Sequence, residues 1–251
     1  SEATSMTSDT QNKIILTIIT VTYNTSCDII CTIESVLTQI KQFGDNKIQY
    51  LIIDGSSTDD TIDIISRYDG LTYLSEPDNG IYDAMNKGVN LSKGDWIYFI
   101  NAGDYLKNIP LDLLDNDKCS DLIVGNVENE NGLVIPCWNK GIIVKNTIPH
   151  QGAFYRRSCF ELYNLEYKIF ADYCHNIKLW KNKAKCRIIN INIAFHSENG
   201  ISNSAESATE LYKLLISEFG WYSAILTYCR FKINGIINKI IHEVHSISNN
   251  I

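Results

Sequence analysis

Runs of apolar residues alternate with segments of helical periodicity through the first part of the chain. Residues 14–23 are an unbroken, largely β-branched run, which predicts a buried strand. Apolar residues at helical spacing then extend from Asp28 to a stop at Gly44, which predicts a crossover helix. Further apolar runs predict short strands at residues 50–53, 72–74 and 96–100. Strands that alternate with helices indicate an α/β fold with a mainly parallel sheet and right-handed crossovers.

A turn, a helix, a strand and a polar loop follow one another between residues 76 and 106. Ile81, Met85 and Val89 recur at helical spacing. We therefore predict a helix over residues 81–91 with these side chains on its apolar face.

The start of that helix is a candidate anion site. Pro77-Asp78-Asn79-Gly80 has turn composition, so the helix after it is expected to offer unpaired backbone N–H groups to a phosphate or a sugar hydroxyl. Asp83 and Lys87 lie four residues apart on the same helix. That spacing fits either an ion pair beside the turn or a solvated surface pair.

Polar side chains stand directly after several predicted strands. They are Tyr23-Asn24, Asp54 and the loop from Asn101 to Asp104. Ligands bind at the carboxyl ends of the strands in open α/β sheets, so we expect these tips to form a site that includes an exposed Asp104. Asp54 has a simpler alternative role as an N-cap or Asx-turn residue.

The periodicity weakens beyond residue 106. Apolar runs at 122–124 and 133–135 flank an Asn- and Gly-containing turn, which predicts a hairpin. Residues 173–180 have helical character, and on the pattern alone Asp172 is a helix N-cap.

Composition and charge exclude several classes of protein. The 251 residues carry a net charge of −7, which argues against a nucleic-acid binder because phosphate contacts need a basic surface. The eight cysteines form no CxxC pair, so we expect reduced thiols in the cytoplasm and neither a zinc site nor a disulfide framework. Residues 1–13 are expected to be a disordered lead or an expression remnant.

Several motifs follow one another in an order that is familiar from one enzyme family. They are ITVTYN (19–24), IIDGSSTDDT (52–61), EPDNGIYDAMNKG (76–88), GDWIYFINAGD (94–104), HQGAFYRR (150–157), FADY (170–173) and FHSENGIS (195–202). The sequence thereby resembles the GT-A-fold glycosyltransferases of family 2, in particular short bacterial enzymes of O-antigen or capsular polysaccharide synthesis. The resemblance implies a Rossmann-like GT-A domain over residues 14–204, with a mixed, mainly parallel sheet flanked by helices, and a helical extension over residues 205–251.

The resemblance also implies a donor half of the site. Thr22, Tyr23 and Asp54 match positions that line the uridine pocket of the family. There a carboxylate can accept a hydrogen bond from the ring N–H, and an aromatic ring can pack on the base. The full set of expected donor-binding residues is Thr22, Tyr23, Asn24, Asp54, Glu76, Asp83, Lys87 and Asn101.

Asp172 matches the catalytic base of the family. Such a base takes the proton of the acceptor hydroxyl in a single displacement that inverts the anomeric centre. His150, Gln151 and Arg156 match the acceptor half, where they would donate hydrogen bonds to phosphate or hydroxyl groups. An exposed surface arginine is the alternative role of Arg156.

One loop departs from the family pattern. The family usually carries DxD or DxDD here to hold a divalent cation and the ribose, whereas this chain has Asn101 and Gly103 in place of acids. Asp104 together with diphosphate oxygens can still hold Mg²⁺ or Mn²⁺. His196 is either a second ligand, which favours Mn²⁺, or a hydrogen-bond donor in the pocket wall.

The C-terminal part carries two features that suit contact with lipid. Residues 178–187 contain four lysines and one arginine without an acid, a block that can face anionic lipid or a lipid-linked diphosphate. Residues 221–244 are amphipathic or nearly apolar, so they either pack on the domain or lie in a membrane interface.

The sequence therefore predicts an inverting transferase that moves glucose, galactose or an N-acetylhexosamine from a UDP-sugar to a saccharide on an undecaprenyl diphosphate carrier. It would act in the cytoplasm or at the inner face of the membrane. A sugar-phosphate nucleotidyltransferase is an alternative, but it needs a glycine-rich basic loop that residues 25–28 do not supply. A non-catalytic nucleotide-sugar-binding homologue is a second alternative, because the DxD acids are missing.

Overall fold

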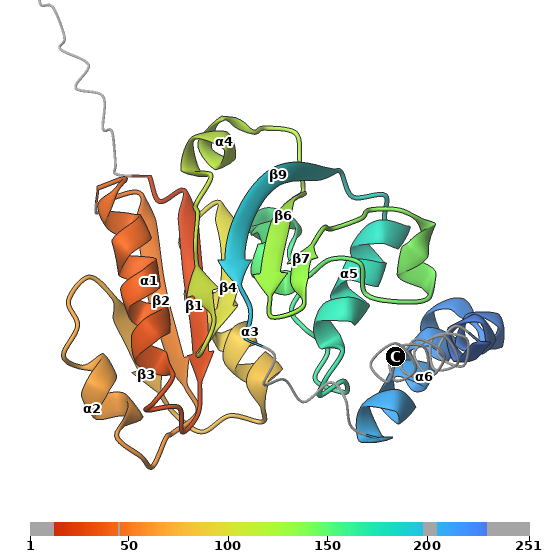
Figure 1. The fold of residues 1–251 in the computed structure, drawn as a ribbon, viewed down its shortest axis with the longest axis horizontal. Helices are drawn as coiled ribbons and strands as arrows, with labels where there is room; N and C mark the ends of the chain where they lie inside the picture. Colours follow the sequence, from red (N-terminus) through yellow and green to blue (C-terminus); the bar gives the residue numbers. More distant parts are fainter. Residues whose placement is uncertain (1–12, 45, 198–204, 230–251) are drawn as a thin grey trace, which may run out of the picture.

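The apolar runs of the sequence build one continuous sheet (Figure 1). In the computed structural model, which describes residues 13–44, 46–197 and 205–229, the strand order is β3-β2-β1-β4-β8-β6-β9-β5, and β7 pairs with β6. The strands are β1 (Leu16–Thr22), β2 (Ile48–Asp54), β3 (Thr72–Ser75), β4 (Trp96–Asn101), β5 (Tyr105–Leu106), β6 (Leu122–Asn129), β7 (Gly132–Val134), β8 (Ala153–Arg156) and β9 (Cys186–Phe195). The helices are α1 (Ile29–Lys41), α2 (Thr61–Ile65), α3 (Ile81–Leu91), α4 (Leu111–Asn116), α5 (Ala171–Lys181) and α6 (Ala205–Phe219).

The first half of the sheet is parallel, as the alternation of strands and helices predicted. β1 pairs in parallel with both β2 and β4, and β2 pairs in parallel with β3. Successive β1 side chains point to opposite faces, so Ile18 packs in the same cluster as α1 and Ile19 in the same cluster as α3. The predicted α/β class is confirmed.

The second half of the sheet reverses direction. β8 lies antiparallel between β4 and β6, and β9 runs parallel to β6 and antiparallel to β5. The predicted hairpin is present as β6 and β7, with Asn129 opposite Gly132 at its turn. The sheet therefore joins a parallel half at β4 to a mixed half, and the carboxyl end of β4 lies at the junction.

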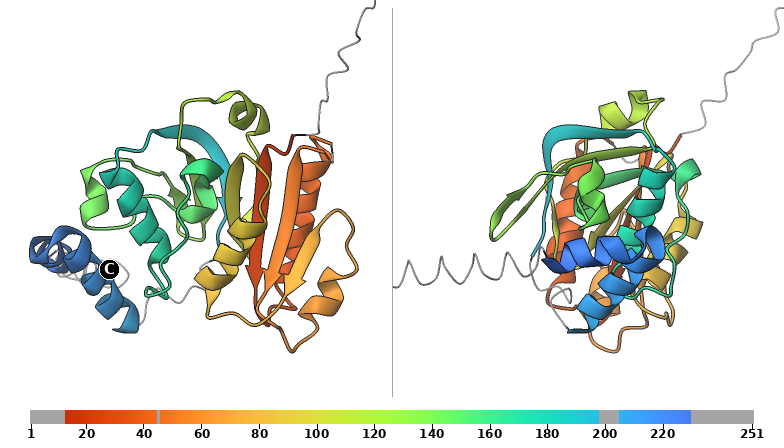
Figure 2. Two further views of the ribbon diagram at one scale, coloured as in Figure 1. Left: turned by 180° about the vertical axis from the view of Figure 1, so that it is seen from behind. Right: turned by 90° about the vertical axis from the view of Figure 1, so that its right-hand side faces the viewer.

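Helices cover both faces of the sheet (Figure 2). Side chains of α1, α2 and α4 share one buried cluster, and those of α3, α5 and α6 share the other. α6 contributes the buried Leu211, Leu214 and Leu215, so this part of the C-terminal extension packs on the domain. The boundary predicted between residues 204 and 205 stays a prediction.

α3 has the predicted bounds but a different buried face. Tyr82 and Met85 are buried, whereas Ile81 is 42% exposed. Gly88 lets the helix approach β1 closely, because a Cβ atom there would lie 2.5 Å from Cγ2 of Ile19.

Some predictions fall on residues that the structure does not describe. These are residues 1–12 of the lead, residues 198–202 of the last motif, and the tail beyond residue 229. Within the described ranges, no helix has the length and apolar character that crossing a membrane requires.

Candidate active site

The tips of the parallel strands meet at one edge of the sheet. Thr22 lies opposite Asp54, which in turn lies opposite Ser75 on β3. Asp54 is fully buried and accepts hydrogen bonds from the Ser57 N–H at 2.9 Å, the Ser57 hydroxyl, and the Ser75 hydroxyl at 2.7 Å. Its carboxylate therefore holds the loop after β2 as an Asx-type turn, which is the simpler of its two expected roles.

A second loop is tied to the first and presents an aromatic ring. Asn24 has a φ of +52° and its Oδ1 accepts the Thr58 N–H at 2.8 Å, while the Asn24 N–H donates to Ser57 Oγ at 2.8 Å. Tyr23 is 60% exposed beside Gly55. An open tyrosine ring on a fixed loop offers a surface on which a base can stack.

Lys87 and Asp83 do not form the ion pair considered from the sequence. Lys87 Nζ contacts Glu76 Oε1 at 3.0 Å and the Pro77 carbonyl at 2.6 Å, on the loop that follows β3. Asp83 Oδ2 instead accepts the Asn79 N–H at 2.9 Å. The carboxylate prefers this position because it caps the start of α3, where the N–H groups and the dipole favour negative charge.

The expected anion site at the start of α3 is thus partly occupied by the protein itself. Asp83 takes the Asn79 N–H, and Asp78 Oδ1 accepts the Gly80 N–H at 2.9 Å. Two carboxylates at this turn would repel a phosphate. A hydroxyl-bearing ligand suits the turn better.

Asp104 is buried rather than exposed, which corrects the expectation from the sequence. Only 2% of the residue is accessible. Its Oδ1 lies 2.8 Å from His196 Nδ1 and 3.2 Å from the Ser197 N–H, and its Oδ2 lies 3.2 Å from Gln151 Nε2. Gln151 therefore joins the Asp104 cluster, and its expected role in acceptor binding stays a prediction. The cluster forms because β9 brings His196 next to the loop that follows β4.

The Asp104–His196 pair fits part of a metal site. A metal-binding histidine usually has its second ring nitrogen hydrogen-bonded to a carboxylate, which is the arrangement here. The carboxylate has about four lone-pair sites, and it faces the Gln151 side-chain amide, the Ser197 N–H and His196 Nδ1. In the described part of the chain no group of three or more His, Cys, Asp or Glu side chains could hold a metal. Most ligands of a bound ion would therefore come from a diphosphate and water.

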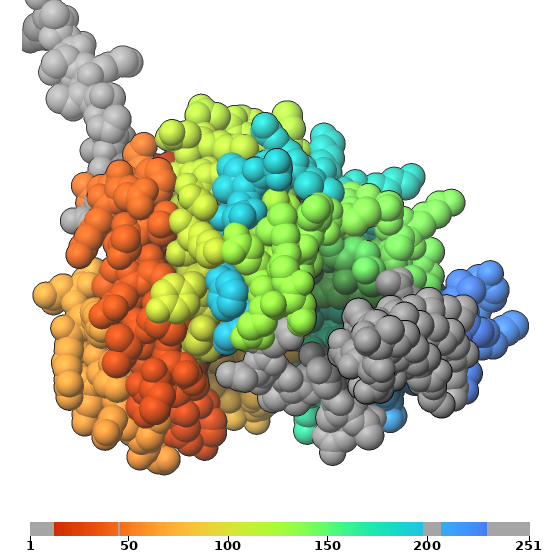
Figure 3. Space-filling model, viewed as in Figure 1, coloured from red at the N-terminus to blue at the C-terminus, as the bar shows by residue number. Residues whose placement is uncertain are grey.

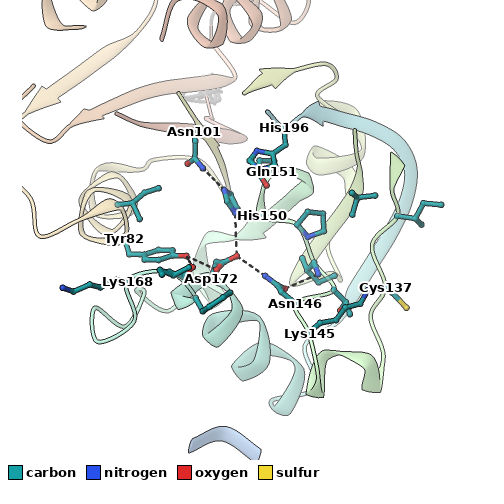
Figure 4. A pocket seen from close by; sticks show the side chains of 18 residues that line it. Tyr82, Asn101, Cys137, Lys145, Asn146, His150, Gln151, Lys168, Asp172 and His196 are labelled. Atoms are coloured by element: carbon teal, nitrogen blue, oxygen red, sulfur yellow. Dashed lines mark hydrogen bonds and ion pairs between the residues drawn. The ribbon is translucent and has the colours of Figure 1, made fainter. Parts of the chain in front are cut away.

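Asp172 lies in the first turn of α5 with both carboxylate oxygens engaged (Figure 4). The Tyr82 hydroxyl is 2.9 Å from Oδ1, and Asn146 Nδ2 is 3.0 Å from Oδ2. His150 Nδ1 is 3.7 Å from the same Oδ2. Burial and the charge of Asp172 hold the pKa of Tyr82 well above its ordinary value, so this hydroxyl stays protonated.

Tyr82 and Asn146 were missed by sequence reasoning. Tyr82 lies inside a quoted motif, but only the fold shows that it reaches α5 across 90 positions of the sequence. Asn146 lies in a segment without a recognisable pattern, and it is fixed by hydrogen bonds from the Ile148 N–H at 3.2 Å and Asn176 Nδ2 at 3.3 Å.

His150 connects Asp172 to the end of β4. Its Nε2 lies 3.2 Å from Asn101 Nδ2 (Figure 4). Asn101 Oδ1 is buried and has no hydrogen-bond partner among the described residues. A ligand hydroxyl or a water that reached this atom would satisfy it.

These side chains line one cavity with a volume of about 540 Å³. Its polar wall contains Asn101, His150, Gln151, Asp172 and His196. Ile81, Val134, Ile135 and Phe170 form an apolar part of the wall. The volume is in the range of cavities that enclose small organic ligands. Five of the site residues predicted from the sequence line this cavity, whereas Thr22, Tyr23 and Asp54 do not.

Arg156 lies away from this cavity, which corrects its assignment to the acceptor site. It is opposite Trp96 at the amino end of β4, and its guanidinium stacks on the Trp96 ring at 4.1 Å. It also donates to the Ser120 carbonyl at 2.6 Å and the Asp117 carbonyl at 3.0 Å. The antiparallel register of β8 places Arg156 at the amino end of β4. Its hydrogen bonds there stabilise the loop that precedes β6.

Comparisons with known proteins agree with this architecture. Residues 17–185 match the family model Glycosyl transferase family 2. A PGL/p-HBAD biosynthesis glycosyltransferase of Mycobacterium bovis (strain BCG / Pasteur 1173P2) is 31% identical in an alignment 189 positions long, and the match covers 67% of this chain and 73% of that protein. This relative is named for a pathway other than O-antigen or capsule synthesis, so the predicted polysaccharide type is not established.

Solved structures share the fold at lower identity. S. aureus TarS 1-349 in complex with UDP-GlcNAc has a TM-score of 0.67 at 19% identity, covering 82% of this chain and 66% of that one. The mannosyltransferase PcManGT from Pyrobaculum calidifontis, in complex with GDP-Man and Mn²⁺, has a TM-score of 0.59 at 13% identity, covering 81% of this chain and 62% of that one. The chain thus spans less than two thirds of each neighbour. Its fold and the family match together show that it belongs to glycosyltransferase family 2.

Proposed function

We propose that this chain is an inverting glycosyltransferase that moves a hexose from a UDP-sugar to a saccharide hydroxyl on a lipid diphosphate carrier of the undecaprenyl type. The observation that supports it best is the Asp172 carboxylate, which faces the cavity near the carboxyl end of β4. Tyr82 and Asn146 hold one oxygen each. A fixed carboxylate in a cavity of ligand size is what general-base catalysis needs.

In the proposed reaction the acceptor hydroxyl oxygen attacks C1 of the donor sugar. A new C–O bond forms while the bond from C1 to the diphosphate oxygen breaks, and UDP leaves with the electron pair. Asp172 takes the hydroxyl proton, an assistance worth about 10²–10⁴ in rate. One displacement inverts C1, so an α-linked donor gives a β-linked product.

The donor is assigned to the strand tips. Tyr23 offers its open ring to the base, and the loop held by Asp54 forms the floor below it. The UDP-GlcNAc complex of TarS supports a uridine donor by analogy of fold, and the GDP-Man complex of PcManGT names the alternative to test. A divalent cation, Mn²⁺ or Mg²⁺, bound beside Asp104 and His196 would neutralise the charge of the departing diphosphate.

The test is Asp172→Asn, which keeps the size of the side chain. Turnover of UDP-sugars with a lipid diphosphate acceptor, measured with and without Mn²⁺, should fall about 10²–10⁴-fold. UDP affinity, measured by titration calorimetry, should stay unchanged. Asp112→Asn is the matched control, because Asp112 also stands in the first turn of a helix but is exposed on α4.

Two outcomes would contradict the proposal. Full turnover in Asp172→Asn would remove Asp172 as the base. UDP binding without turnover of any UDP-sugar or GDP-sugar by the unaltered chain would favour the non-catalytic homologue.

A further inference from the structure

The residues that follow α6 turn their large apolar side chains outward. Residues 221–229 are helical, and the two residues that face inward are the small polar Ser223 and Thr227, each 1% exposed. The exposed side chains, called the outer patch below, are Trp221 (70%), Tyr222 (62%), Ile225 (48%), Leu226 (37%) and Tyr228 (51%). A surface helix ordinarily buries its apolar stripe. The arrangement here is the reverse.

Hydrogen bonds fix this orientation. The Ser223 hydroxyl donates to the Leu215 carbonyl at 2.9 Å, and the Thr227 hydroxyl donates to the Val144 carbonyl at 3.2 Å. Rotating the helix to bury Trp221 would break both bonds and expose two buried hydroxyls. These hydrogen bonds therefore keep the outer patch facing solvent. A contiguous exposed apolar patch of this kind marks an interaction surface.

The helix that carries the outer patch packs, through its inner face, next to a segment in the wall of the candidate active-site cavity. Val144, which binds Thr227, is followed directly by Lys145 and Asn146, and both of these line the cavity. Figure 4 shows Lys145 near Asn146 on one side of Asp172 and Lys168 on the other. In Figures 1 and 3 the blue part of the chain, α6 and residues 221–229, lies at the opposite end of the molecule from α2 and β3.

We propose that the outer patch docks the enzyme on the interfacial region of an anionic lipid membrane. Three of its five side chains are tryptophan or tyrosine, which favour the headgroup level because their rings are apolar with a polar atom at the edge. Lys145, which follows Val144, and Lys168 are exposed side chains that line the cavity, and in the described part of the chain neither forms an ion pair with a carboxylate. Their charge adds attraction to anionic lipid.

The charge also favours lipid over a second copy of the chain. In a symmetric dimer the same surface faces itself, so the lysines of both copies would approach one another. The acidic groups nearby are already engaged. Glu210 accepts the N–H groups of Lys168, Ile169 and Phe170, and Glu218 pairs with Lys181.

The docking proposal does not depend on the proposed transfer reaction. The purpose that docking would serve does rest on the proposed function. A lipid-linked acceptor carries its diphosphate at the membrane surface. A docking patch on the helix next to the cavity wall would hold the enzyme at that surface.

Vesicle co-sedimentation of the full chain tests the proposal. Vesicles of phosphatidylcholine mixed with phosphatidylglycerol should bind the chain, and vesicles of phosphatidylcholine alone should bind it more weakly. Trp221→Ser with Tyr222→Ser should lower the affinity roughly tenfold for each aromatic removed. Tyr73→Ser with Leu91→Ser is the control, because these large apolar side chains are also exposed, at 42% and 46%, on the parallel half of the fold. UDP binding by both variants shows that they fold.

Unchanged vesicle binding by the Trp221 and Tyr222 variant would overturn the proposal. So would a dimer in light scattering that this variant abolishes while the unaltered chain fails to bind vesicles. Vesicle binding that depends on the outer patch, together with absent turnover, would refute the proposed reaction and leave the docking surface intact.

Discussion

His175 should make the fold lose stability as the pH falls below neutrality. It lies on α5 with an exposed fraction of 3%, and its ring packs 4.3 Å from the ring of Phe160. Burial, reinforced by the charge of Lys178, lowers its pKa from 6.5 to about 4. Its Nε2 atom has no hydrogen-bond partner among the described residues, so nothing there compensates a proton on that nitrogen.

The size and the sign of the effect follow from the two pKa values. The unfolded chain binds a proton at this histidine below pH 6.5, whereas the folded chain excludes it until about pH 4. The free energy of unfolding therefore decreases as the pH falls through this window. The full difference is about 3 kcal/mol, at about 1.4 kcal/mol for each pH unit. That is a large part of the stability of a typical domain.

Urea unfolding at a series of pH values measures the effect. His175→Phe keeps an aromatic ring in place without a titrating group, so its unfolding free energy should lose most of the slope between pH 6.5 and about pH 4.5. Asp117→Asn is the control. Burial opposes its ionisation, but N–H groups of Ser120 and Cys119 and the side chain of Arg187 lower the pKa of Asp117 to about 2. The stability that the Asp117 carboxylate contributes is lost only below pH 3.8. The unfolding free energy of Asp117→Asn should therefore keep its pH dependence between pH 6.5 and about pH 4.5. Equal slopes in His175→Phe and the unaltered chain would refute the reasoning.

Three further predictions test the site and the core. Arg156→Gln should lower the unfolding free energy by about 1–3 kcal/mol, because the Arg156 guanidinium donates hydrogen bonds to backbone carbonyls. The KM for the acceptor should stay constant. A raised KM at unchanged stability would instead support a role of Arg156 in acceptor binding. Gly88→Ala should destabilise the fold by about 1–3 kcal/mol in urea unfolding despite the higher helix propensity of alanine, since its Cβ would overlap Ile19; a stabilised variant would show that α3 can shift. Asp54→Ala should weaken UDP binding in calorimetry and also lower the unfolding free energy by about 3 kcal/mol, because it removes the shared acceptor of several donors; weaker binding at an unchanged unfolding midpoint would assign Asp54 to the nucleotide alone.

The parallel half of the sheet could be predicted because its signals are local. Each strand is a continuous apolar run and each helix has its own period, as the match of α3 to residues 81–91 shows. In the mixed half only the β6–β7 hairpin and α5 have such signals. β5 is two residues long and β8 is four, and each is defined by partners far away in the sequence.

The candidate site shows the same limit at the level of single residues. Motifs identified Asp172 and Asp104, but not what surrounds them. The burial of Asp104 depends on His196, 92 positions away, and the position of Arg156 depends on the register of β8. Lys87 could be placed near the donor loop, but only the structure shows that it pairs with Glu76 and leaves Asp83 to cap α3.

β9 is the last strand to be synthesised in the described part of the chain, and this order affects how the protein folds on the ribosome. Half of the Asp104 cluster is synthesised long before His196 and Ser197 exist, and until they emerge a carboxylate destined for the interior faces water without its partners. The parallel half can assemble as soon as β4 leaves the exit tunnel, whereas the pocket must wait for the last strand. A nascent chain that stops before residue 186 would therefore contain the loops at the tips of the parallel strands but an incomplete Asp104 cluster.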